Sequence, residues 1–181
     1  MNDVVKIINE KLLLHDLKFS KTPLVIGGMA MEYYGIRSAG ADIDLIIHDS
    51  DYQLLADKFP AKRKDIWGDL GIVIDPFEIW RSIMLFDYDF FSQDAISHDG
   101  ILIMSLEKLL FSRACATGIK TEQTKHKYKI DLELIEKHYY EKYTNKEFTV
   151  SAELNFAAYN ENGGIIYGGN YQNAPPVIGN R

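Results

Sequence analysis

The sequence predicts an α/β protein of the α+β kind, in which a small mixed β-sheet is flanked by helices. Three observations support this class. Short apolar runs of strand length alternate with amphipathic segments of helix length. The 46% hydrophobic and 25% charged residues are typical of globular domains. A chain of 181 residues is also long enough to bury a core. We expect two C-terminal helices to close one side of a cleft.

The N-terminal third predicts two strands joined by a glycine turn and a helix. Residues 4–17 space apolar side chains three and four apart, which favours an amphipathic helix. Residues 24–26 form a short apolar run that ends in Gly27-Gly28, as a buried strand entering a turn does. Residues 29–34 resume helical character. A loop over residues 36–41 then leads into a second strand over residues 42–47.

The middle of the chain predicts one helix and two strands. The polar residues 48–51 supply capping side chains for a helix over residues 52–59. A basic connector follows, and two apolar runs beyond it favour strands. The next stretch carries scattered aspartates and predicts a loop. These segments are the connector 60–64, the strands 70–74 and 77–80, and the loop with Asp87, Asp89 and Asp94.

The last part predicts a strand, two helices and a tail. A strand over residues 100–104 precedes a helix over 106–117, which Ser105 caps, and a second helix covers 130–143. We expect a catalytic core over 1–104, a helical part over 105–145 and a Gly/Asn-rich tail over 146–181, too poor in aliphatic residues to fold on its own.

Composition limits the classes of function. A formal net charge of −6 argues against a basic footprint over the whole surface, so a polyanion site must be local. The apolar stretches are far shorter than the roughly 18 residues that cross a bilayer. Asp3 and Glu10 interrupt any apolar leader, which predicts a cytoplasmic protein without a membrane partner.

The chemically informative stretch is residues 24–47. Asp42 and Asp44 are two apart on a predicted strand, so both side chains face the same way, about 6.6 Å apart along it. Carboxylate oxygens are the ligands that Mg²⁺ prefers. Gly27 and Gly28 let a phosphate approach the backbone closely, and the helix that follows favours an anion. The order of these features predicts adjoining phosphate and metal sites.

The same stretch resembles a known superfamily. Val25-Ile26-Gly27-Gly28-Met29-Ala30, then Arg37, then Asp42-Ile43-Asp44-Leu45 is similar to the signature of nucleotidyltransferases with the DNA-polymerase-β-like fold. The resemblance covers residues 20–50 most strongly and extends more loosely to residue 143. It implies that fold and a metal-dependent transfer of a nucleoside monophosphate from a nucleoside triphosphate to a hydroxyl acceptor. The acceptor class, whether protein, transfer RNA or small molecule, stays open.

The resemblance also implies site residues. Two Mg²⁺ ions would be held by Asp42, Asp44 and a third acid, with the triphosphate at Gly27-Gly28 and Arg37 neutralising its charge. Two residues compete for the third acid. Glu78 is preferred because Phe77 and Ile79 flank it in the apolar-acid-apolar pattern of the family, whereas Asp75 precedes a proline and resembles a turn residue.

The C-terminal half resembles single-domain members described as abortive-infection or toxin-type nucleotidyltransferases. Lys127 and Asp131 lie one helical turn apart and share a face, so the resemblance implies that they bind the nucleotide. The alternative is a surface ion pair. Such a protein could have an antitoxin partner. Two other functions stay open: an inactive binding or regulatory protein with this fold, and a nuclease or phosphohydrolase that uses water as acceptor.

Overall fold

The computed structural model describes residues 3–66, 68–119 and 122–142. The chain divides into two compact units, Met1–Ile135 and Glu136–Arg181. The first unit holds all the strands that the structure describes, and of the second the structure describes only residues 136–142, at the end of a helix. The predicted tail over 146–181 lies outside the described residues.

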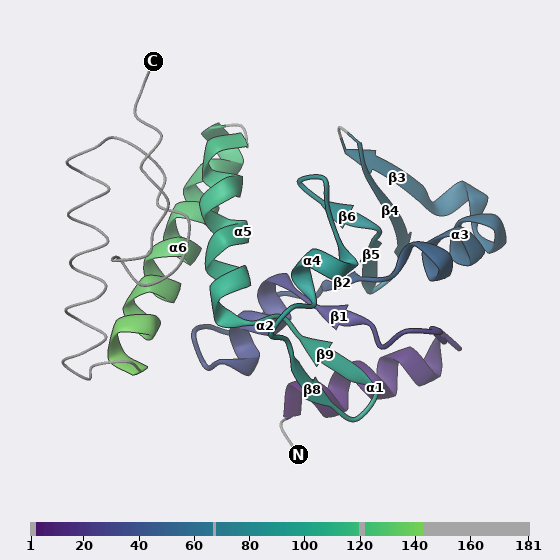
Figure 1. The fold of residues 1–181 in the computed structure, drawn as a ribbon, viewed down its shortest axis with the longest axis horizontal. Coiled ribbons are helices and arrows are strands. Elements are labelled where there is room, and N and C mark those ends of the chain that lie inside the picture. Colours follow the sequence, from purple (N-terminus) through teal and green to yellow (C-terminus); the bar gives the residue numbers. More distant parts are fainter. Residues whose placement is uncertain (1–2, 67, 120–121, 143–181) are drawn as a thin grey trace. The chain divides into compact units, whose positions relative to one another are not determined.

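A mixed sheet of seven strands is the centre of the first unit (Figure 1). Its strand order is β3-β4-β5-β2-β1-β9-β8, with β2 parallel to β5, β1 parallel to β9 and the other neighbours antiparallel. This confirms the α/β class and the mixed sheet. In sheet order the strands are Arg63–Ile66, Asp69–Ile74, Phe77–Trp80, Ile43–Ile46, Leu24–Val25, Ile101–Ile103 and Ile96–His98. A separate hairpin pairs β6 with β7, Ser82–Ile83 and Phe86–Asp87.

The helices form where the sequence offers an apolar stripe and a cap. One stripe of α1, at three-four spacing, is buried. His48 caps α3 by accepting from the Ser50 N–H, and the Ser105 hydroxyl accepts from the Lys108 N–H at the start of α5. The bounds are α1 Asp3–Leu14, α2 Gly27–Tyr33, α3 Asp49–Lys58, η1 Pro60–Lys62, α4 Tyr88–Phe91, α5 Leu106–Ile119 and α6 Glu122–Lys142.

The two faces of the sheet differ in chemistry. On one face Ile43, Leu45 and Ile79 are fully buried. The His15 ring, just beyond α1, packs edge-on against Phe77 of the same face, with ring centroids 5.7 Å apart. Asp44 lies on the opposite face, as the alternation along β2 predicts. One face of the sheet is therefore core, and the other is available for a site.

Two parts of the sequence-based assignment are wrong. The connector over 60–64 contains η1 and the start of β3, an edge strand whose charged residues hide its strand character. The predicted loop contains β7, α4 and β8. The turn between β6 and β7 uses Met84 and Leu85 at positive φ (53° and 65°), and neither residue signals a turn.

Helix boundaries also differ from those expected. α2 begins at Gly27 rather than at Met29, so the glycine pair belongs to its first turn. α3 begins at Asp49, three residues earlier than expected, because the cap is His48 itself. α6 begins at Glu122, about two turns before the predicted start. Lys- and Gln-rich segments have good helix propensity without an apolar stripe, which explains the late prediction for α6.

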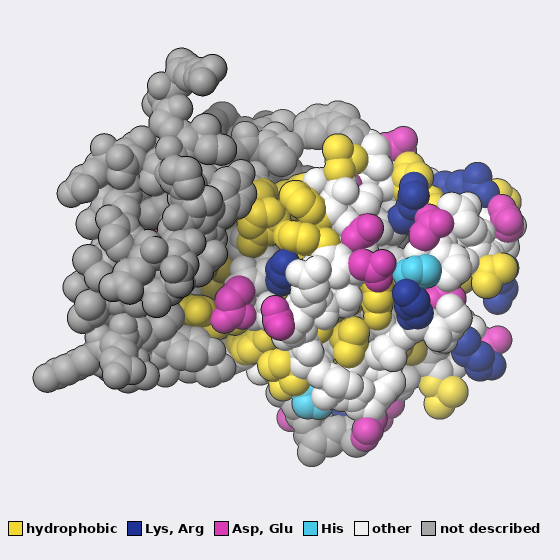
Figure 2. Space-filling model, viewed as in Figure 1, with side chains coloured by type: hydrophobic (Ala, Val, Ile, Leu, Met, Phe, Trp, Pro, Cys, Tyr) yellow, Lys and Arg dark blue, Asp and Glu magenta, His cyan; other side chains and the backbone are white. Residues whose placement is uncertain are grey.

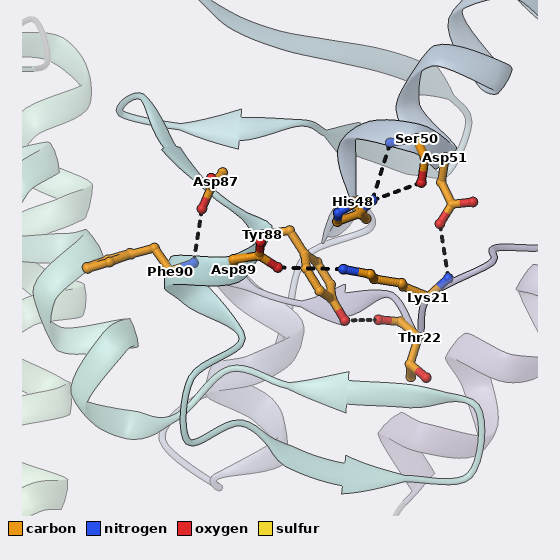
Figure 3. A network of polar contacts seen from close by, with 9 residues as sticks. All are labelled: Lys21, Thr22, His48, Ser50, Asp51, Asp87, Tyr88, Asp89 and Phe90. Atoms are coloured by element: carbon orange, nitrogen blue, oxygen red, sulfur yellow. Dashed lines mark hydrogen bonds and ion pairs between the residues drawn. The ribbon is translucent and has the colours of Figure 1, made fainter.

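A polar network fixes the chain that enters β1 (Figure 3). The buried Asp51 carboxylate accepts hydrogen bonds from the N–H groups of Ser20 (2.8 Å) and Lys21 (3.2 Å). The Tyr88 hydroxyl of α4 donates to the Thr22 carbonyl (2.8 Å). Side chains of α3 and α4 thus fix the segment that leads into β1. The position of β1 in turn sets the position of Gly27 on the open face of the sheet.

Surface chemistry agrees with the composition. On the face shown in Figure 2, Lys and Arg side chains are interspersed with Asp and Glu rather than gathered into a field of one sign. Within the described ranges, no helix combines the length and the apolar character that a membrane crossing needs.

Candidate active site

A cavity of about 300 Å³ lies on the open face of the sheet. Strands β2, β3, β4 and β5 supply one side of it, the turn of the β6–β7 hairpin a second, and helices α5 and α6 a third. Apolar side chains make up much of its wall, among them Ile46, Trp80, Met84 and Met104. A cavity of this size and mixed lining is typical of small-molecule sites.

Two carboxylates lie side by side in this cavity. Asp44 of β2 and Glu78 of β5 are direct partners on neighbouring parallel strands, about 4.8 Å apart in the sheet. Burial first, and then the negative charge of Glu78, raise the pKa of Asp44, while the charge of Arg113 and a hydrogen bond from Trp80 oppose the rise. The fold therefore places two like charges together in a partly desolvated setting.

Gly27 makes room for the Asp44 carboxylate. Its φ of 62° is in the left-handed region, and a Cβ there would lie 2.6 Å from Asp44 Oδ2. At Gly28 a Cβ would meet only ordinary contacts, the nearest at 3.7 Å from Ala39, and Gly28 does not line the cavity. Of the predicted glycine pair, only Gly27 belongs to the site.

Two cations also line the cavity, Lys64 and Arg113. The Lys64 ammonium of β3 lies 3.2 Å from Glu78 Oε1 and 3.3 Å from Oε2. Arg113 of α5 is largely buried, and its guanidinium lies 5.2 Å from the centre of the Tyr128 ring. Its Nε is 3.3 Å from Asp131 Oδ2 but makes no hydrogen bond. The cavity thus has acids on the sheet and a cation on each side of them.

Arg37 and Asp131, both predicted to bind nucleotide, bind each other. Arg37 donates from Nε to Asp131 Oδ1 (2.7 Å) and from Nη2 to Oδ2 (3.0 Å), and Asp131 is nearly fully buried. The hydrogen bond to Asp131 is the main reason that the pKa of Arg37 is raised. Neither residue lines the cavity. They are linked to the cavity through Arg113, whose Nε lies 3.3 Å from the same Asp131 carboxylate.

The other predicted residues lie outside the cavity lining. Asp42 is exposed directly before β2, and Asp75 is exposed in the turn between β4 and β5. Lys127 is exposed on α6, whereas its neighbour Tyr128 lines the cavity. Of the two candidates for the third acid, the geometry favours Glu78.

Two residues that line the cavity, Arg113 and Lys64, were not singled out from the sequence. Arg113 is a single cation within an otherwise apolar or small stretch of helix, and that isolation is a signal of a buried charge. Lys64 carried no comparable signal, because it stands in a basic run and its strand was not recognised.

The donor set fits a hard cation in part. Within the described ranges, no group of three or more His, Cys, Asp or Glu side chains is arranged to hold a metal ion. Asp44 and Glu78 nevertheless offer carboxylates in register. The raised pKa of Asp44 has burial as its main cause and the charge of Glu78 as its second, and a bound cation would offset the repulsion between the two carboxylates. Mg²⁺ is commonly bound through one or two carboxylates, with substrate phosphates and water as its other ligands.

No family model, curated protein or solved structure matches this chain. Any assignment of function therefore depends on the residues of the cavity and on the chemistry that they can perform.

Proposed function

We propose that the protein is a metal-dependent nucleotidyltransferase, which moves a nucleoside monophosphate from a nucleoside triphosphate to a hydroxyl acceptor. The supporting observation is the in-register pair of carboxylates, Asp44 and Glu78. They line the same cavity as Gly27 and Arg113. Two adjacent carboxylates that attract a hard cation, facing a buried guanidinium that attracts an anion, suit a metal-bound triphosphate.

Each residue then has a role. Asp44 and Glu78 would hold Mg²⁺, and Asp42, two residues along the chain from Asp44, would be a ligand of a second ion. The chemistry supplied by bound Mg²⁺ is charge neutralisation at the phosphates and a lower pKa of the attacking hydroxyl. Arg113 would bind phosphate oxygens, held by Asp131. The apolar wall around Trp80 and Met104 would contact the less polar parts of the substrates.

The test is transfer of label from each α-³²P-labelled nucleoside triphosphate, with Mg²⁺, to protein, RNA and small-molecule fractions. Mass spectrometry of the labelled fraction then identifies the added mass. Glu78→Gln is expected to lower the rate by more than about tenfold, because metal-assisted phosphoryl chemistry depends on several kcal/mol of charge stabilisation. Asp75→Asn is the matched control and should retain activity.

The outcomes separate the alternatives. Equal loss in Glu78→Gln and Asp75→Asn would contradict the assignment of Glu78. Triphosphate binding with no turnover in any fraction would favour a regulatory binding protein with this fold. Release of inorganic phosphate or free monophosphate, with no labelled acceptor, would favour a hydrolase.

A further inference from the structure

Lys64 binds the carboxylate that the proposed function assigns to a metal ion. Its ammonium lies almost equally far from the two oxygens of Glu78, at 3.2 and 3.3 Å. Both side chains line the cavity. The Lys64 ammonium, with a charge of +1, therefore already contacts the Glu78 oxygens that a divalent cation would bind.

The register of the sheet explains how Lys64 reaches Glu78. Lys64 of β3 pairs with Gly71 of β4, and Gly71 pairs with Trp80 of β5, so the three positions form a row across one face. Gly71 has no side chain to block this row, and a Cβ there would lie 2.7 Å from the Trp80 ring. The lysine stem can therefore cross β4 and place its ammonium 5.2 Å from the centre of the Trp80 ring, beside Glu78.

The ion pair is also easily exchanged. The Lys64 and Glu78 side chains are 37% and 30% exposed, and β3 is an edge strand. Ion pairs this accessible to water are weak, and the lysine ammonium is a compact charge on a flexible stem. Arg113 is different, because it is largely buried and held by Asp131. Of the two cations in the cavity lining, Lys64 is the one that can move.

We propose that Lys64 is a displaceable counter-ion: it leaves Glu78 when a divalent cation binds there, and its ammonium then binds phosphate oxygens of the triphosphate. The inference rests on the proposed function and deepens it. Without substrate, Lys64 relieves the repulsion between Glu78 and Asp44 and competes with bare metal. With the triphosphate present, the same ammonium favours the metal complex. The site is then selective for metal-bound triphosphate over free metal.

The experiment compares wild type with Lys64→Met, which keeps the stem and removes the charge. Mn²⁺ binding without nucleotide is measured by electron paramagnetic resonance. Binding of inorganic tripolyphosphate is measured by calorimetry in excess Mg²⁺. Lys64→Met should bind Mn²⁺ alone about fivefold more tightly, since a weak competitor is gone, and tripolyphosphate about tenfold more weakly. Lys62→Met is the matched control, because Lys62 is exposed in η1 and outside the cavity lining.

The outcomes distinguish this inference from the proposed function. If wild type binds Mn²⁺ and transfers nucleotide, but Lys64→Met leaves the Mn²⁺ affinity unchanged or weakens it, the displaceable counter-ion is wrong and the proposed function stands. An unchanged tripolyphosphate affinity in Lys64→Met would likewise overturn it. If neither wild type nor Lys64→Met binds Mn²⁺, both proposals fail. Equal changes in Lys62→Met would show a general charge effect and would overturn the specific role of Lys64.

Discussion

At the scale of the residue, the charge of Asp44 opposes folding. Burial and the neighbouring Glu78 raise the pKa of Asp44 above its value in the unfolded chain, 3.8. Below pH 3.8 both states keep the proton. As pH rises, the unfolded chain ionises first, so the free energy of unfolding falls until the folded carboxyl has also ionised. At neutral pH the ionised Asp44 therefore destabilises the fold, as is common for site residues that bind charged ligands.

Asp44→Asn tests this cost directly. The variant should have a higher melting temperature than wild type at pH 7, and the gain should shrink toward pH 3, where wild-type Asp44 is protonated. Under the proposed function it should also lose nucleotidyl transfer by more than about tenfold, because the proposed metal ligand has lost its charge. Thermal unfolding from pH 3 to 8 and the labelling assay measure the two effects. A variant less stable than wild type at pH 7 would contradict the argument.

Substitutions at the two glycines in the first turn of α2 should have opposite effects. Gly27→Ala forces an alanine into the left-handed region, which costs about 1–2 kcal/mol, and pushes a methyl group against Asp44 Oδ2. Both the free energy of unfolding and the activity should fall. Gly28→Ala is the matched control, since its new methyl group would have ordinary contacts and helix propensity favours alanine. Urea unfolding measures the change in the free energy of unfolding for both variants. Equal changes would contradict the assignment of Gly27 to the site.

At the scale of the element, Asp51 couples α3 to the chain before β1. Asp51→Ala leaves the N–H groups of Ser20 and Lys21 without their acceptor in a part-buried setting, so we expect a loss of about 2–4 kcal/mol in the free energy of unfolding. Asp57→Ala in the same helix is the control. Its side chain is 82% exposed and its ion pair with Arg63 should contribute less than about 1 kcal/mol. Similar losses in both variants would show that the helix, not the bonds to the segment before β1, is affected.

At the scale of the whole molecule, Asp131 joins three parts of the chain. It binds Arg37 from the segment after α2 and Arg113 from α5, while itself belonging to α6. Asp131→Ala would leave two partly buried guanidinium groups without their shared acid, and the expected loss is about 3–5 kcal/mol. Adding Arg37→Met should recover part of it, since one unpaired charge is then gone. A double-mutant cycle by urea unfolding measures this coupling, and strictly additive losses would contradict it.

The sheet could be predicted from local pattern only where the pattern was strong. Alternation along residues 42–47 puts Ile43 and Leu45 on the face opposite Asp44, where both are buried, and the apolar runs at β4, β5 and β9 were recognised. β3 was missed because an edge strand needs charges that resemble those of a connector. The β6–β7 hairpin was missed because the Asp69 carboxylate binds the N–H groups of Met84 and Leu85, a tertiary contact with no local signal.

The residues of the candidate site also differ in whether a local sequence pattern could identify them. Gly27 and Asp44 could be chosen from the glycine pair and the Asp-x-Asp pattern, and Glu78 from the apolar-acid-apolar pattern that the resemblance implies. The partner of Arg37 could not, because Asp131 is 94 residues away and only the packed fold brings the two together. For the same reason Lys127, chosen by helical spacing, lies exposed, while Arg113 on another helix lines the cavity.

The position of β1 has a consequence for synthesis. β1 stands between β2 and β9, and Leu24 pairs with Leu102. At about 5–20 residues per second, a ribosome takes about 4–16 s to make the chain between these partners. Throughout that interval one edge of β1 has no partner strand, so the nascent chain exposes an apolar template for unwanted pairing. The strand that precedes Gly27 is thus made well before β9, yet its last hydrogen bonds can form only when β9 is present.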